Sequence, residues 1–207
     1  MAAPSRFCHI VYRTNRYDDM VRWYQVALEA RIQVANEKVA FLTYDDEHHR
    51  MAIRNLGGMS GDQDSHRNVG VGIAHVAYAW PTLEELIDTY YRMKRFGVLP
   101  IRSTRHGVTV SFYYEDPDRN QVEFQLDLLD TDAASEYMRT EAFIANTSER
   151  FDTEELLRRY EAGEPVDSLI YRIEQPQRLG SRYIKGNDQQ PWSSSSNAGI
   201  STVGASA

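Results

Sequence analysis

The chain has 207 residues, and its 42% hydrophobic content is enough to bury the core of an ordinary domain. Its formal net charge of -7 argues against nucleic acid or an anionic membrane surface as the main partner, because both repel a like-charged protein. Cys8 is the single cysteine, so no internal disulfide forms and we expect a reducing compartment. No signal-peptide pattern and no long apolar stretch occurs. We therefore expect a cytoplasmic globular protein that acts on a small molecule.

One sequence unit occurs twice. When the sequence is shifted by 66 positions (75 minus 9), His9-Ile-Val-Tyr lies over His75-Val-Ala-Tyr, and Tyr24 lies over Tyr90. Each copy begins with a β-rich run, continues with a helical pattern and ends in further β-rich segments. The pattern predicts an α+β fold in which two tandem βαβββ modules, over about residues 6–56 and 70–130, form an open half-barrel.

In chain order, the elements expected in the first module are a strand over 6–13, a helix over 18–30 and strands over 38–44 and 47–54. Those of the second module are a strand over 71–80, a helix, and strands over 108–114 and 121–127. Thr82 and Glu85 form a capping box at the start of the second helix, and Gly97 suits its C-terminal end.

The composition changes after the second module. Residues 131–185 read as a helical extension, most clearly over 152–161, and residues 186–207 read as a disordered tail. The alternative for the tail is docking on a neighbouring subunit, because Tyr183 and Trp192 are unusual in a purely solvated segment.

Two histidines and a carboxylate stand at related strand positions. His9 and His75 match across the repeat, and side-chain alternation places Glu123 on the polar face of its strand, away from the apolar layer. A lone strand histidine is more often a packed or surface residue than a ligand, but the match across the repeat favours a shared site. The three side chains therefore predict a metal centre with open coordination positions, as in ferrous iron sites that bind substrate and dioxygen.

Two further histidines lie on strands that line the predicted cleft. Alternation places His49 with Met51 and directs it inward, whereas His48 faces solvent or lies behind the cleft and is expected to matter less. His106 precedes Gly107 at a strand entrance, where taken alone it reads as a surface loop residue.

The second module carries a recognisable segment, which runs Thr104-Arg-His-Gly-Val-Thr-Val-Ser-Phe-Tyr-Tyr-Glu-Asp-Pro-Asp-Arg-Asn-Gln-Val-Glu123. It resembles the signature of type I extradiol ring-cleavage dioxygenases, which belong to the vicinal oxygen chelate superfamily. The segment 41–53 also resembles the paired-histidine strand of that family. The resemblance covers about residues 6–130, and the chain resembles the members of the family that have one such domain.

The resemblance implies that His9, His75 and Glu123 are ligands of Fe(II), with Mn(II) as the alternative metal, and that His49, His106 and Tyr113 are the catalytic residues of the pocket. It implies that an aromatic vicinal diol chelates the metal and that dioxygen cleaves one ring carbon–carbon bond beside the diol. His49 would stabilise superoxide or act as an acid–base catalyst, and the other two would hydrogen-bond the substrate.

The chain departs from the family pattern in two places. Arg119 stands where glycine or proline is expected, so we expect Asn120 to take the left-handed conformation of that turn. The chain also lacks the second domain of two-domain members, and we expect a homodimer or higher homo-oligomer.

Two other functions remain open on the same scaffold. The first is a glyoxalase-like isomerase or lyase that uses the metal as a Lewis acid, although the first module offers no acid over 51–54 to complete such a site. The second is a non-catalytic ligand-binding protein of the bleomycin-resistance type. Retention of the whole set of ligands and pocket residues argues against it.

Overall fold

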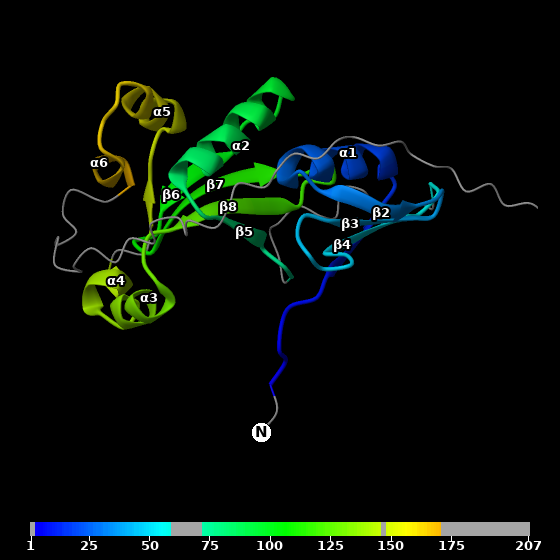
Figure 1. Cartoon of the computed structure of the whole chain (residues 1–207), viewed down its shortest axis with the longest axis horizontal. Coiled ribbons are helices and arrows are strands. Elements are labelled where there is room, and N and C mark those ends of the chain that lie inside the picture. Colours follow the sequence, from blue (N-terminus) through cyan, green and yellow to red (C-terminus); the bar gives the residue numbers. More distant parts are fainter. Residues whose placement is uncertain (1–2, 59–71, 146–147, 171–207) are drawn as a thin grey trace, which may run out of the picture.

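The computed structural model describes residues 3–58, 72–145 and 148–170 (Figure 1). The first module contains β1 (Ile10–Thr14), α1 (Tyr17–Leu28), β2 (Arg31–Ala35), β3 (Val39–Thr43) and β4 (Met51–Asn55). Its sheet has the order β1-β4-β3-β2, with β1 and β4 parallel and the other pairs antiparallel.

The second module repeats this arrangement. It contains β5 (Val76–Trp80), α2 (Leu83–Arg95), β6 (Arg102–Arg105), β7 (Thr109–Glu115) and β8 (Gln121–Asp127). The strand order β5-β8-β7-β6 matches that of the first module, again with one parallel pair, β5 with β8. The prediction of two tandem βαβββ modules is confirmed.

The helix boundaries follow from the capping residues. The Thr82 side chain accepts a hydrogen bond from the backbone N–H of Glu85 at 3.1 Å, and Gly97 has the left-handed φ of 85° that a helix C-terminus favours. The start and end predicted for the second helix are therefore confirmed. α1 ends instead at Glu29, which takes a left-handed φ of 51°.

The strand predicted over 47–54 is shorter than expected, because β4 begins only at Met51. Asp45 causes this. Its carboxylate accepts hydrogen bonds from the backbone N–H of Glu47 at 3.1 Å and from Nε of Arg50 at 2.9 Å, which bends the segment before β4. Strand alternation therefore does not apply to His48 and His49, although the His48 side chain is 71% exposed, as predicted, and the His49 ring packs against His9 and Phe41.

The two modules share one hydrophobic core, and α1 and α2 lie side by side over the sheets (Figure 1). Polar contacts cross the seam between them. Tyr24 of α1 donates to the buried carboxylate of Asp116 at 3.1 Å, and Arg92 of α2 donates to the backbone oxygens of Val26 at 2.7 Å and Ala27 at 3.3 Å. The carbonyls near the end of α1 are thus capped by the other module.

The extension contains α3 (Thr131–Tyr137), α4 (Glu141–Ala145), β9 (Glu149–Arg150), α5 (Thr153–Glu161) and α6 (Val166–Ile170). β9 pairs with β6 and so adds a fifth strand to the second sheet, which the sequence did not predict. The segment between the modules is described only up to Gly58 and again from Gly72, and residues 171–185 of the predicted extension and the tail over 186–207 lie outside the described residues. Among the described residues, no helix is long and apolar enough to cross a bilayer.

The turn between β7 and β8 differs from the expectation. Arg119, not Asn120, takes the left-handed conformation, with φ of 67°. The Asp116 carboxylate explains this, because it accepts bonds from the backbone N–H of Asn120 at 2.9 Å and from its side-chain amide at 2.8 Å, which fixes Asn120. The left-handed position therefore falls one residue earlier.

We expect Arg119→Gly to raise the free energy of unfolding by up to about 1.6 kcal/mol. Relief of a left-handed side chain is worth about 1–2 kcal/mol, and the added freedom of the unfolded chain costs about 0.4–1 kcal/mol. Urea unfolding would measure the change. The matched control, Asn120→Gly, loses the side-chain amide bond to Asp116 and should destabilise by about 1 kcal/mol; a gain in that variant instead would contradict the assignment.

Asp116 makes stability depend on pH. Burial raises its pKa from 3.8 to about 6, although Asn120 and Tyr24 donate to the charged form. Protonation then favours the folded state, so this stabilisation is complete below pH 4 and is lost as the pH rises through 6. Between pH 4 and pH 7 we expect wild type to lose up to about 3 kcal/mol relative to Asp116→Asn. If the free energies of unfolding of the two proteins changed equally with pH across this range, the assignment would be contradicted.

Candidate metal centre

Glu123 is the buried acid of the second module. Strand β8 alternates as predicted, with Val122 and Phe124 in the core and Glu123 on the opposite face, where its side chain is 7% exposed. The ladder register sets Ala77 of β5 on one side of Glu123 and Tyr113 of β7 on the other. A carboxylate this deeply buried requires partners.

The partners form a chain of hydrogen bonds. Tyr113 donates its hydroxyl hydrogen to Oε1 of Glu123 at 2.7 Å, so its oxygen accepts from Nε2 of His106 at 2.9 Å. On the other carboxylate oxygen, Nε2 of His75 lies 2.9 Å from Oε2. The structure thus brings together four of the six predicted site residues.

The separation of His75 and Glu123 suits a metal. Two ligand atoms at about 2.1 Å from one ion and at right angles to each other lie about 3.0 Å apart. The 2.9 Å between His75 Nε2 and Glu123 Oε2 is close to this value, and one neutral imidazole with one carboxylate is a donor pair that first-row divalent metals accept. These two residues fit the implied ion.

Tyr113 remains protonated over the working range of pH. Burial, followed by its hydrogen bond to Glu123, raises its pKa to about 12. The guanidinium of Arg102 lies 3.7 Å from the centre of the Tyr113 ring and donates to the side chain of Gln121 at 3.1 Å. Arg102 thus holds the ring in place.

The remaining site residues gather in the first module. The rings of His9 and His49 lie 4.5 Å apart between centroids, and Phe41 packs edge-on against His49 at 5.0 Å. Arg50 holds the backbone on both sides of His9, since its guanidinium donates to the Cys8 carbonyl at 3.2 Å and its own carbonyl accepts from the N–H of Ile10 at 3.0 Å.

His9 does not join the pair in the second module. Across residues 3–58, 72–145 and 148–170, no three His, Cys, Asp or Glu side chains gather closely enough to hold an ion. His9 and His75 still occupy equivalent places, because each directly precedes the first strand of its module, β1 or β5. The structure therefore places two of the predicted ligands together and leaves the third beside His49.

Two neighbours of the site were missed from the sequence. Arg102 lies on β6, a strand that the sequence did not predict, so its place beside Tyr113 had no signal. Glu47 was read as the start of a strand, yet its side chain is only 6% exposed and contacts Arg6 and His48. The only sequence signal was an acidic residue directly before the paired histidines, which does not by itself predict burial.

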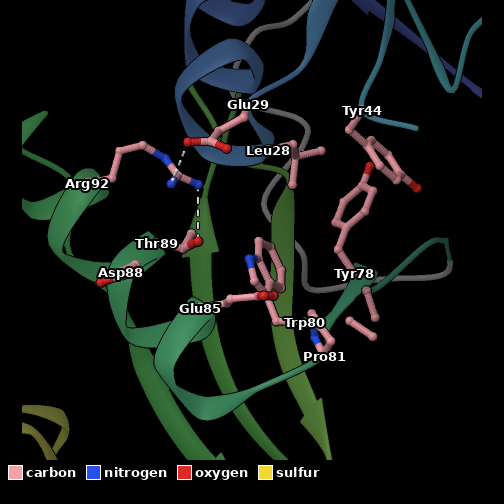
Figure 2. A pocket seen from close by; sticks show the side chains of 12 residues that line it. Leu28, Glu29, Tyr44, Tyr78, Trp80, Pro81, Glu85, Asp88, Thr89 and Arg92 are labelled. Atoms are coloured by element: carbon pink, nitrogen blue, oxygen red, sulfur yellow. Dashed lines mark hydrogen bonds and ion pairs between the residues drawn. The ribbon is translucent and has the colours of Figure 1, made fainter. Parts of the chain in front are cut away.

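A cavity of about 510 Å³ lies elsewhere between the modules, and Figure 2 shows the residues that line it. Tyr44, Tyr78 and Trp80 face it from one side, and Glu85 and Arg92 face it from α2. None of the predicted site residues lines it. The hydrogen-bonded cluster around Glu123 therefore marks the chemistry better than this cavity does.

Known proteins match most of the chain. The family model described as the Glyoxalase/Bleomycin resistance protein/Dioxygenase superfamily matches residues 6–124. Biphenyl-2,3-diol 1,2-dioxygenase 3 of Rhodococcus globerulus is 37% identical over 174 residues, which cover 83% of this chain and 90% of the relative. Biphenyl-2,3-diol 1,2-dioxygenase 2 of the same organism is 38% identical and covers 82% and 88%.

We expect Glu123→Ala and His75→Ala to lose the metal. Each removes one of the two donor atoms that lie 2.9 Å apart, whereas Tyr113→Phe removes only a hydrogen bond to the carboxylate and should weaken metal affinity about 10-fold. Metal content after anaerobic purification and titration measures both effects. Full metal content in either alanine variant would contradict the ligand pair.

Proposed function

This chain belongs to the Glyoxalase/Bleomycin resistance protein/Dioxygenase superfamily as an extradiol ring-cleavage dioxygenase, and we propose that it cleaves an aromatic vicinal diol at a mononuclear Fe(II) centre. The observation that carries the proposed centre is the pair of donor atoms on His75 and Glu123, 2.9 Å apart in a buried polar cluster. We propose His9 as the third ligand, because it holds the equivalent position in the other module.

Bound Fe(II) would supply open coordination positions at which the diol and dioxygen meet. The protein side chains would supply orientation and proton transfer. Tyr113, whose pKa is raised to about 12, is protonated near neutral pH and can turn its hydroxyl from Glu123 to a substrate oxygen while His106 still donates to it. His49 would serve as the acid–base residue, and burial beside His48 and His9 lowers its pKa, which favours the neutral imidazole.

We propose a bicyclic diol as the first substrate to test. Both relatives are named for biphenyl-2,3-diol, and they match this chain over more than four-fifths of its length. Apolar side chains also stand exposed two residues along the chain from each histidine: Val11 is 53% exposed and Ile73 is 73% exposed. Such surface can pack against a second ring.

Oxygen uptake with a panel of diols tests the proposal. Iron-loaded protein should consume one dioxygen per molecule of 2,3-dihydroxybiphenyl or catechol and form a yellow ring-opened product. His49→Ala and His106→Ala should keep the iron, and kcat should fall by about 100-fold or more, because a general acid–base group typically contributes at least this factor to the rate. Iron-loaded protein that consumes no oxygen with any diol would favour the glyoxalase-like alternative, in which the metal acts without oxygen.

A further inference from the structure

We propose that the cavity between the two modules is a binding site for a small organic ammonium ion. The cavity has a volume of about 510 Å³, which lies within the range of about 300–1,000 Å³ typical of sites for small molecules. It is separate from the metal centre, because none of the residues placed there lines it. The proposal is therefore independent of the dioxygenase function, and it rests on the aromatic rings and the charges around the cavity.

Aromatic side chains form one wall of the cavity. The rings of Tyr44 and Tyr78 lie 5.6 Å apart between centroids at an angle of 86°, so they form a right-angled corner. Trp80 lies two residues along β5 from Tyr78 and lines the same cavity (Figure 2). The π faces of tyrosine and tryptophan attract cations, and clusters of such rings are the usual recognition surface for ammonium ions that carry carbon groups.

The charges around the cavity also favour a cation. Glu29, Glu85 and Asp88 line it, and Arg92 is the basic side chain among the described residues that do so. Burial raises the pKa of Glu85, and the like charges of Glu84 and Asp88 raise it further. A positive ligand beside Glu85 would relieve this repulsion.

The positive charge of Arg92 is already offset by other groups. Its Nη1 donates to the Glu29 carboxylate at 3.0 Å. Its Nε donates to the backbone carbonyl of Val26 at 2.7 Å and its Nη2 to that of Ala27 at 3.3 Å, at the negative end of the α1 dipole. Arg92 therefore binds the end of α1, and the Glu85 carboxylate remains for a ligand.

The lining suits an organic cation better than an inorganic one. Calcium is held by about 6–8 oxygen atoms that converge on one point. Within the described part of the chain, no three acidic, histidine or cysteine side chains gather in this way. An organic ammonium ion instead needs a broad aromatic surface with a carboxylate nearby, which Tyr44, Tyr78 and Trp80 provide together with Glu85.

A ligand in this cavity would touch both modules. Tyr44 follows β3 of the first module, whereas Trp80 ends β5 and Glu85 lies on α2 of the second. Because such a ligand binds the folded chain and not the unfolded one, its binding raises the stability of the fold. The unfolding temperature is therefore a second measure of occupancy.

Choline and 3,3-dimethylbutan-1-ol test the proposal in the full chain, because the alcohol has the same shape with a carbon atom in place of the charged nitrogen. Calorimetric titration should show saturable binding of choline, with the alcohol at least about 5-fold weaker, and choline should raise the unfolding temperature. KCl at the same concentration controls for screening of charges. Lack of saturable choline binding, equal binding of the two compounds or an equal temperature rise with KCl would overturn the proposal.

Variants locate the site. Glu85→Gln should weaken choline binding by about 2- to 5-fold, and Tyr44→Leu should weaken it by about 2- to 10-fold through the loss of one ring. The matched control is Glu84→Gln, one residue earlier on α2, which removes the same charge from a side chain that does not line the cavity. Equal weakening by the two glutamine variants would indicate general attraction to the acidic surface and would overturn the assignment of the cavity.

Discussion

The buried carboxylate of Glu123 is the interaction on which the site depends. A charge at 7% exposure is costly unless both oxygens are paired, and here Tyr113 satisfies one oxygen and His75 the other. Each partner is in turn held, Tyr113 by His106 and by the Arg102 guanidinium. Four residues from β6, β7 and the strand entrances are therefore ordered by the need to satisfy one side chain.

The first module is organised differently around its own buried carboxylate. Glu47 lies on a bend, and its partners are a guanidinium and an imidazole. The two modules therefore share one backbone pattern but differ in their polar clusters. The cluster around Glu123 is built on residues of neighbouring strands, and the cluster around Glu47 on adjacent residues of a loop. The first cluster suits a metal ligand pair, and the second ties the bend before β4 to Arg6.

Much of this arrangement could be predicted from the sequence. Regular periodicity and capping signals located both long helices and strand β8 to within a few residues, and strand alternation directed Glu123 away from the core. The errors fall where side chains override the backbone pattern. Asp45 bends the segment that contains His48 and His49, and Asp116 moves the left-handed residue to Arg119. The contacts of Arg102 and Glu47 depend on tertiary placement, which no local pattern encodes.

The seam between the modules has a mechanical consequence. Tyr24 holds Asp116 at the start of the β7–β8 turn, and Arg92 holds the last carbonyls of α1, so the helical side of the molecule is clamped at two points. The sheets carry no ladder of hydrogen bonds from one module to the other in the described residues. The two halves are therefore joined through side chains and packed helices rather than through a shared sheet, so the placement of the modules is set by residues such as Tyr24 and Arg92 and not by backbone pairing.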